Sequence, residues 1–259
     1  MKSYLINLGK KTLNFFDFIG GITKLLIETV FWIFVPPIKK ERTLEQAIAI
    51  GINSLPIVTL VALFIGIIFA LQTAYLMKKL SSEMYIANIV ALSLTRELGP
   101  VITALIVAGR CGAAITAEIG TMTVTEQVDA LKTLATNPVK YLVVPRFLSL
   151  VFMLPILTIY ADLVGIFGGY LICVNRLSIS PNMYIATTFQ GLVNKDIFTG
   201  LIKTVFFGMI IALVACYEGL NVKGGAEGVG KSTTTSVVIS FILIIVADCF
   251  FTALFYFFI

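Results

Sequence analysis

The sequence predicts an all-α integral membrane protein with an N-terminal interfacial amphipathic helix, five transmembrane helices and a short cytoplasmic coupling helix. Hydrophobic residues make up 58% of the 259 residues and charged residues only 13%. A soluble domain has about 25% charged residues, so this chain has too little charge to cover a globular surface in water. Apolar segments long enough to cross a bilayer recur along it. We therefore expect a single transmembrane domain over residues 1–259.

The first 42 residues predict a helix that lies in the membrane interface. Residues 13–35 are mostly apolar, but their polar positions recur at helical spacing and form one stripe: Asp17, Gly21, Lys24 and Glu28. A polar stripe on an otherwise apolar helix is typical of interfacial helices. Pro36 and Pro37 end the helix. A true membrane span over residues 13–35 remains the alternative.

Five apolar segments predict the membrane spans, which cover residues 55–77, 85–114, 141–174, 197–217 and 236–258. Pro100 interrupts the second span, so we expect a helix kink there. Lys and Arg residues are more numerous in the N-terminal region and the polar stretches 116–140 and 218–235 than in the remaining loops. By the positive-inside rule these regions are cytoplasmic, and 175–196 is a periplasmic loop. This assignment places Arg110 on the cytoplasmic side and Lys203 on the outer side.

The stretch 116–140 predicts a short amphipathic helix between the second and third spans. Thr123 and Glu126 have the spacing of a capping box at a helix start. The residues that follow fall on two faces, one apolar (Val128, Leu131, Leu134) and one charged (Glu126, Asp129, Lys132). A bare connection between spans needs only a few residues, so a helix here indicates an element that docks onto a partner.

Three charged residues interrupt the apolar segments: Arg96, Glu97 and Asp248. A charge at the bilayer centre costs about 2.5–3.5 kcal/mol on insertion scales, so each must be paired or must face a wet cavity. Neighbours on a helix point about 100° apart, so Arg96 and Glu97 are not each other's best partners. We expect Arg96 to pair with Asp248 or with Glu97 of a second copy. Asp162 is a weaker candidate.

The sequence excludes most chemistry within this chain. It contains no histidine and no GxSxG motif, and its four cysteines are far apart, so the usual general base and zinc ligands are missing. We expect no catalytic residue, no metal and no cofactor. The net charge of +5 comes without a basic run interleaved with aromatics, so we expect no nucleic-acid partner either.

Residues 225–232 match the P-loop pattern GxxxxGK[ST]. A P-loop follows a buried β-strand and opens a helix of an α/β sheet, whereas apolar spans flank this segment on both sides. We interpret it as a glycine-rich cytoplasmic turn that starts the last span, and we expect no nucleotide to bind there.

The segment 94–145 resembles the MlaE-type permeases, also called YrbE, of bacterial lipid-transporting ABC systems. The resemblance covers nearly the whole chain, from the interfacial helix to the last span, and is strongest over the runs TRELGP, AGRCGAAITAEIGTM and TEQVDAL. It implies a permease subunit that moves phospholipid or a similar lipid between the inner and outer membranes, with ATP hydrolysis in a partner chain. The implied localisation is the bacterial inner membrane. The family segment similar to 225–232 commonly lacks a lysine, so Lys231 departs from the pattern.

The resemblance also implies partners and site residues. Such permeases form homodimers, grip a cytoplasmic ATPase through the helix between spans two and three, and meet an MCE-domain substrate-binding protein on the other side. The implied ATPase contacts are Thr125, Glu126, Asp129 and Lys132. Arg96 and Glu97 would lie at the lipid cavity, and we expect Asp248 to face the same substrate cavity. A purely structural ion pair remains the alternative. A secondary transporter or channel that uses Arg96, Glu97 and Asp248 as an ion path is the competing function, and an intramembrane enzyme is a third.

Overall fold

The computed structural model describes residues 2–36 and 40–258, and that part of the chain is almost entirely helical, without a β-strand. Its helices are, in chain order, α1 (Lys2–Ile33), α2 (Lys40–Gly51), α3 (Leu55–Lys79), α4 (Ile86–Ser93), α5 (Gly99–Val107), α6 (Ala113–Val124), α7 (Gln127–Thr133), α8 (Val144–Leu177), α9 (Pro181–Gly191), α10 (Asn194–Leu220) and α11 (Gly225–Phe258). Three π-helical turns join some of them: Leu94–Leu98, Ala108–Gly112 and Val139–Val143.

Within the described ranges, five helical segments are long and apolar enough to cross a membrane: Lys40–Lys79, Glu83–Val124, Val139–Leu177, Asn194–Leu220 and Gly225–Phe257. They confirm the all-α membrane fold and the five predicted spans. The second span was predicted to end at residue 114, but its helix continues to Val124. The threonines beyond Ile115 do not break the helix, because the hydroxyls of Thr116 and Thr121 donate to carbonyl oxygens four residues earlier.

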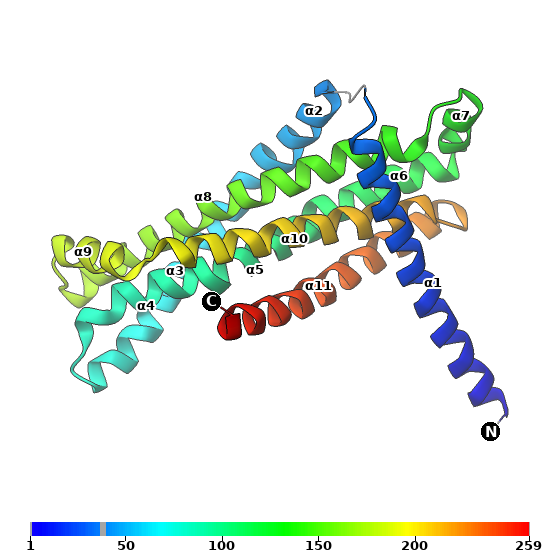
Figure 1. Cartoon of the computed structure of the whole chain (residues 1–259). Coiled ribbons are helices and arrows are strands. Elements are labelled where there is room, and N and C mark those ends of the chain that lie inside the picture. The colour runs from blue at the N-terminus through cyan, green and yellow to red at the C-terminus, as the bar shows by residue number, and fades with distance from the viewer. Residues whose placement is uncertain (1, 37–39, 259) are drawn as a thin grey trace.

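The third span lies at the centre of the bundle and packs against the first and the fourth (Figure 1). Leu150, Leu154 and Leu157 on α8 are fully buried in this core. Small residues allow the closest approach: a Cβ atom on Gly66 of α3 would lie 1.9 Å from the carbonyl oxygen of Gly165 on α8. Glycine at such a contact is typical of membrane helix pairs, which are held by van der Waals packing.

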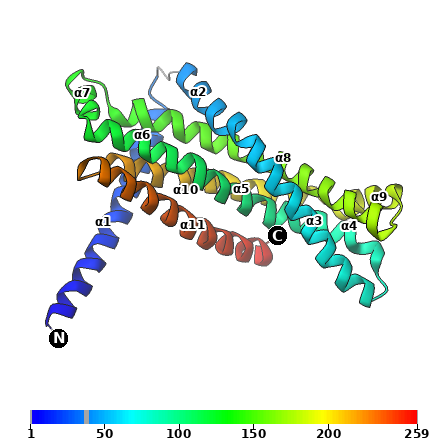
Figure 2. The ribbon, with the colours of Figure 1, turned by 180° about the vertical axis from the view of Figure 1, so that it is seen from behind.

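The last span, α11, lies at the edge of the bundle (Figure 2). It packs on α10 and α6 along one side, and only 11% of its most apolar window is buried. Its other side exposes large apolar residues: Val238, Ile242, Ile245, Val246, Phe250 and Tyr256. The P-loop match lies at the start of this helix, and the segment is helical from Gly225 on, where the sequence predicted a turn.

Helix α1 leaves the bundle at its N-terminal end and crosses the other helices near its C-terminal end (Figure 1). Leu25 and Thr29 are buried, and the ring of Phe18 packs edge-on against Tyr217 of α10. Lys24 and Glu28 of the predicted polar stripe form an exposed ion pair at 3.9 Å. Because α1 is not among the five candidate spans, a position in the membrane interface stays the prediction for it.

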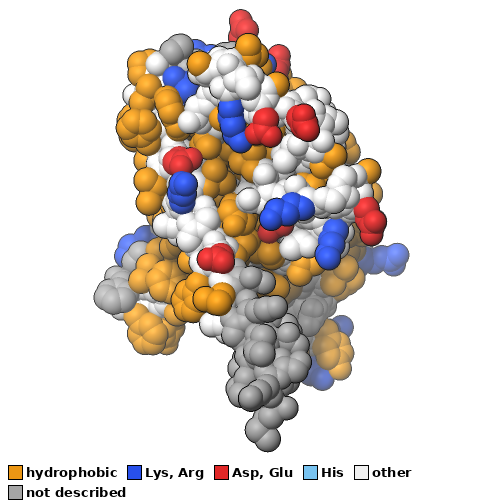
Figure 3. All heavy atoms as spheres, turned by 90° about the vertical axis from the view of Figure 1, so that its right-hand side faces the viewer, with side chains coloured by type: hydrophobic (Ala, Val, Ile, Leu, Met, Phe, Trp, Pro, Cys, Tyr) orange, Lys and Arg blue, Asp and Glu red, His pale blue; other side chains and the backbone are white. Residues whose placement is uncertain are grey.

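Helix α7 stands at one end of the bundle, and charged side chains of both signs are scattered over that end (Figure 3). The predicted capping box before it is wrong. The hydroxyl of Thr123 donates to the carbonyl oxygens of Ile119 and Gly219, because α6 has not yet ended at this residue. Glu126 precedes α7 in the left-handed region with φ of 60°, and its side chain makes no capping hydrogen bond. At the opposite end, α9 connects the third and fourth spans.

Candidate functional site

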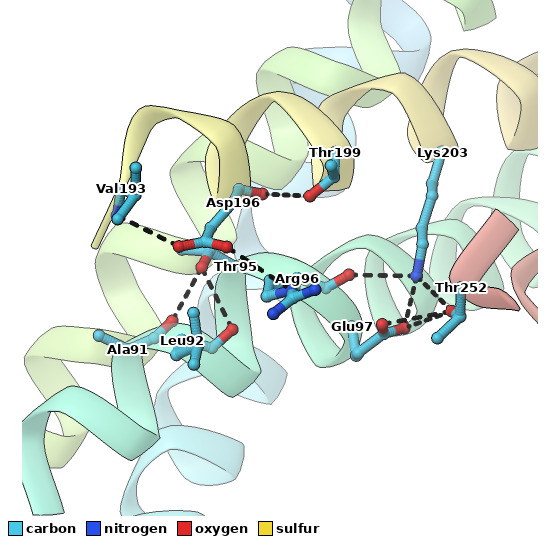
Figure 4. Close-up of polar contacts among 10 residues, drawn as sticks. All are labelled: Ala91, Leu92, Thr95, Arg96, Glu97, Val193, Asp196, Thr199, Lys203 and Thr252. Carbon is cyan, nitrogen blue, oxygen red and sulfur yellow. Dashed lines mark hydrogen bonds and ion pairs between the residues drawn. The ribbon is translucent and has the colours of Figure 1, made fainter. Parts of the chain in front are cut away.

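One polar cluster joins the second, fourth and fifth spans around Lys203 of α10 (Figure 4). The lysine side chain is only 2% exposed. Its Nζ atom lies within hydrogen-bonding distance of four oxygen atoms: Glu97 Oε2 at 2.5 Å, Thr252 Oγ1 at 2.7 Å, Asp248 Oδ1 at 2.9 Å and the Arg96 carbonyl at 3.3 Å. A buried ammonium is tolerated only when it is paired and hydrogen-bonded. We call Lys203, Glu97, Asp248 and Thr252 the Lys203 cluster.

The backbone around Pro100 explains why one of these acceptors is a main-chain carbonyl. Proline has no N–H, so the carbonyl oxygen of Arg96, four residues earlier, loses its α-helical donor. The π-turn Leu94–Leu98 is followed by Gly99 and then by Pro100, which occupies the first turn of α5. Lys203 donates to the Arg96 carbonyl instead. Pro100 thus removes a hydrogen-bond donor, and Lys203, about one hundred residues later in the chain, supplies another to the same carbonyl oxygen.

Gly200 allows α10 to approach the same π-turn. A Cβ atom at this position would lie 2.1 Å from the carbonyl oxygen of Thr95, a distance that no side chain can occupy. Lys203 follows Gly200 by three residues and so lies on nearly the same helix face. The pair Gly200 and Lys203 thus brings the fourth span against the widened turn and places the ammonium beside the carbonyl oxygen of Arg96.

Arg96 has a different partner from those predicted. Its Nε atom lies 3.6 Å from Asp196 Oδ1 at the start of α10 (Figure 4), whereas Asp248 pairs with Lys203. The expectation of an Arg96–Asp248 pair is therefore wrong. Asp196 is well placed because its other oxygen accepts the N–H of Val193, which fixes the carboxylate at the helix start. With 43% of its side chain exposed, Arg96 can still reach another anion.

The site is polar, charged and open on one side. Its ionisable members are two cations (Arg96, Lys203) and three carboxylates (Glu97, Asp196, Asp248), so its formal charge is −1. Lys203 is buried, while 38% of the Glu97 side chain is exposed. No group of three or more potential metal ligands occurs in the part of the chain that the structure describes. The arrangement offers paired charges to a polar group that enters between apolar helices.

Sequence reasoning missed Lys203, Asp196 and Thr252. Lys203 carried a usable signal, because it falls inside the predicted span 197–217, but it was counted with the outer flank by the positive-inside rule. Arg110 lies in a π-turn within the second helical segment, and its assignment to the cytoplasmic side stays a prediction. Asp162, the weaker candidate, lies against Gly99 of the second span, and its buried Oδ1 atom has no hydrogen-bond partner among the described residues.

The predicted ATPase contacts lie together at the far end of the second span. Asp129 and Lys132 form an exposed ion pair at 2.7 Å on α7, and the hydroxyl of Thr125 donates to Thr121 at the end of α6. Val128 is buried and anchors α7 to the bundle. At a rise of 1.5 Å per residue, Thr125 is about 40 Å along the helical segment from Glu97. The two groups of candidate residues are therefore separate sites.

The comparisons with known proteins agree on one family. The sequence profile described as Permease MlaE matches residues 43–254. The chain is 43% identical over 250 residues to a probable ABC transporter permease protein of Rickettsia conorii, and the match covers 96% of each chain. It is 35% identical over 255 residues to the intermembrane phospholipid transport system permease protein MlaE of Haemophilus influenzae, with 97% of each chain covered. It is also 38% identical over 216 residues to a chloroplastic protein of Arabidopsis thaliana, TRIGALACTOSYLDIACYLGLYCEROL 1, over 83% of this chain and 62% of that one.

Proposed function

The chain belongs to the MlaE permease family, and from this premise we propose that it moves phospholipid between the inner and outer membranes as the membrane-spanning subunit of an ABC transporter. The Lys203 cluster is the observation that carries this proposal. Together with the neighbouring Arg96, it places exposed carboxylate and guanidinium groups among apolar helices, where a charge is otherwise unfavourable. A phospholipid has the matching division into a charged headgroup and apolar chains.

The surroundings of the cluster fit such a ligand. Phe206 of α10 and Phe251 of α11 pack together with ring centroids 4.6 Å apart, and Phe250 next to them is exposed. Acyl chains can lie against this aromatic surface while the headgroup meets Glu97 and Arg96. The roles of Arg96, Glu97 and Asp248 in the substrate cavity thus remain our proposal, now extended to Lys203.

ATP hydrolysis belongs to a partner chain in this proposal. The P-loop match lies in the helix that forms the fifth span, and its glycines are part of that helix from Gly225 on, so it cannot form a phosphate-cradling loop after a strand. Helix α7 is the element that a cytoplasmic ATPase would grip, through Thr125, Glu126, Asp129 and Lys132. This assignment places α7 in the cytoplasm and the chain in the bacterial inner membrane.

A second copy of the chain would complete the cavity. Asp248 and Thr252 lie on α11, whose outer face is apolar and exposed. A copy that covers this face would enclose the space between two Lys203 clusters and would bury apolar surface. On the α9 side, an MCE-domain substrate-binding protein would receive or deliver the lipid.

The test is reconstitution of the chain with the ATPase encoded beside it. Fluorescent phospholipid should leave the vesicles only with ATP, and Lys203→Met should reduce the rate at least about tenfold. Lys195→Met is the matched control, because Lys195 is an exposed lysine on the same helix. Ion flux without ATP or ATPase would instead support a secondary transporter or channel and would refute the proposal.

A further inference from the structure

The second π-turn, Ala108–Gly112, places a second arginine of the same span in an unusual setting. Arg110 is half-buried, and its recorded hydrogen bonds all use Nη1. This atom lies within hydrogen-bonding distance of Ser54 Oγ at 2.7 Å, Cys111 Sγ at 3.2 Å and the Ala49 carbonyl at 3.3 Å. Nε and Nη2 have no acceptor among the described residues. One edge of the guanidinium is thus fixed, and its other donors remain available.

Arg110 differs from three other charged side chains of the spans, Arg96, Lys203 and Arg146, in having no anion. Arg96 pairs with Asp196, Lys203 pairs with two carboxylates, and Arg146 lies 2.8 Å from Glu118. Over residues 2–36 and 40–258, no carboxylate lies within 4.0 Å of the Arg110 guanidinium. Arginine keeps its charge in proteins, and a half-buried charge is stabilised by a partner of opposite charge. The free edge of this guanidinium is therefore suited to an anion from outside the chain.

A cavity of about 270 Å³ lies beside it. Its polar wall comes from Gln46 and Asn53 near the start of the first span and from Arg110 and Glu118 of the second. Ile50 and Ile115 supply an apolar floor. The carboxylate of Glu118 does not make the cavity purely acidic, because Arg146 already pairs with it. An anion with an apolar extension fits these walls.

From the sequence we infer that the cavity lies at the level of a lipid headgroup. Asn53 and Ser54 directly precede the apolar run that starts at Leu55, so they mark the point where the first span meets the membrane boundary on the α7 side. Arg110 hydrogen-bonds to Ser54 and is therefore at the same level. It follows Glu97 by 13 residues, about 20 Å along the helical segment. The cavity is thus distinct from the Lys203 cluster.

We propose that the Arg110 cavity binds the phosphodiester of a phospholipid from the leaflet on the α7 side. Nε and Nη2 present the fork geometry that matches two phosphate oxygens, while the amides of Gln46 and Asn53 can donate to the third or to the glycerol oxygens. The acyl chains leave along the apolar floor into the bilayer. The further claim that this is the loading or unloading point of the transport path rests on the proposed function; the binding itself does not.

Binding by the full-length chain in detergent tests the proposal, with native mass spectrometry as the readout. The probes are dioleoylphosphatidylethanolamine and dioleoylglycerol, which has the same acyl chains without the phosphate. We expect the phospholipid to bind the wild type and Arg110→Gln to bind it about tenfold or more weakly, with Arg110→Lys in between. Arg176→Gln, which changes an exposed arginine at the other end of the bundle, should bind as the wild type does.

Several results would overturn the proposal. Equal binding of the two probes by the wild type would show that the phosphate is not recognised, and equal phospholipid binding by Arg110→Gln would exclude this arginine. Competition by millimolar inorganic phosphate would assign the cavity to free phosphate instead. Should Arg110→Gln not fold, Asn53→Leu keeps the arginine, removes one donor, and should weaken phospholipid binding about threefold. Because no ATP or ATPase is present, a negative result leaves the proposed transport function untouched.

Discussion

The ammonium of Lys203 donates a hydrogen bond to the backbone carbonyl of Arg96 at 3.3 Å. This carbonyl lacks its usual helical donor, because Pro100 has no N–H. The same ammonium holds the carboxylates of Glu97 and Asp248. The buried side chain of Lys203 on the fourth span thus links the second span, where the helical hydrogen-bond pattern is interrupted, to a carboxylate of the fifth span. Any relative movement of these three spans must change its contacts, which makes the cluster a natural place for transport to be controlled.

Replacing Lys203 by methionine should destabilise the protein. Removing one partner of a buried ion pair costs about 3–5 kcal/mol, and we expect about 3 kcal/mol here because Glu97 is partly exposed. Neutralising the acids as well, in Lys203→Met/Glu97→Gln/Asp248→Asn, should recover most of the stability but none of the transport. Thermal unfolding in detergent and ATP-driven lipid transfer measure the two effects. A triple variant with wild-type transport would show that the cluster serves packing alone.

Gly200 should be irreplaceable for steric reasons. In Gly200→Ala the new Cβ meets the Thr95 carbonyl, and overpacking of this kind costs about 1–3 kcal/mol. The control is Gly230→Ala on α11, where a Cβ meets nothing within 4 Å. That change should be neutral or stabilising by up to about 1 kcal/mol, because alanine is the better helix former. Equal unfolding temperatures for the two variants would contradict the close approach of α10 to the π-turn.

Pro100→Ala tests the link between the missing N–H and Lys203. The alanine N–H can donate to the Arg96 carbonyl, which removes the need for the ammonium there. We expect little change in stability, within about 1 kcal/mol, because one hydrogen bond replaces another. We expect a clear loss of transport, because Lys203 becomes free to shift toward its carboxylates. Lipid transfer and unfolding temperature, measured on the same preparation, separate these outcomes; unchanged transport would disconnect the π-turn from function.

The spans and their order could be predicted from the sequence, because long apolar runs dominate this chain. The ends of helices were less predictable. Thr123 and Glu126 have the spacing of a capping box, yet the helix before them continues, since a threonine hydroxyl can bond to a carbonyl of its own helix as easily as it caps the next one. Helix α7 was expected, but it starts after a left-handed residue rather than at a cap.

The charged residues of the site were partly predictable for a similar reason. Arg96, Glu97 and Asp248 can be identified as candidates from the sequence, because each is a charge inside an apolar run. Their partners depend on how helices far apart in the sequence pack. Asp196 and Lys203 lie on one face of α10, and the spacing of residues in the sequence does not show that this face packs against the second span. The π-turns that aim Arg96 and Arg110 have no sequence signature of their own, apart from Pro100 beside the first.

Helix α7 should contribute to assembly rather than to stability. Its ion pair is exposed, and such pairs contribute about 0.2–1 kcal/mol. The exchange Asp129→Lys/Lys132→Asp keeps an ion pair on α7 but reverses both charges toward a partner. We expect an unchanged unfolding temperature and loss of the co-purifying ATPase. If the exchanged variant still elutes with a fully active ATPase, these two residues do not form the contact.

Native cysteines offer a direct test of the second copy. Cys249 on α11 is exposed, whereas Cys111, Cys173 and Cys216 are buried. If α11 faces its counterpart in a dimer, a bifunctional maleimide added to membranes should join two chains and give a product of twice the 28.2 kDa chain mass. Cys249→Ser should abolish the product. If cross-linkers of every length leave only single chains, α11 faces lipid or another partner instead of a second copy.

Arg146 should connect the α7 end to the body of the bundle. It is 4% exposed, pairs with Glu118 of α6 at 2.8 Å, and donates to the Leu142 carbonyl in the π-turn that begins the third span. Arg146→Met leaves Glu118 without its cation, but that carboxylate is half-exposed, so we expect a loss near the low end of the range of about 3–5 kcal/mol for a broken buried pair. Glu118→Gln keeps one hydrogen-bond acceptor and should cost less.

If the pair transmits movement from α7, Glu118→Gln should keep the ATPase bound and hydrolysing while lipid transfer falls. Hydrolysis and transfer that fall in equal proportion would show that the pair only holds the two helices together.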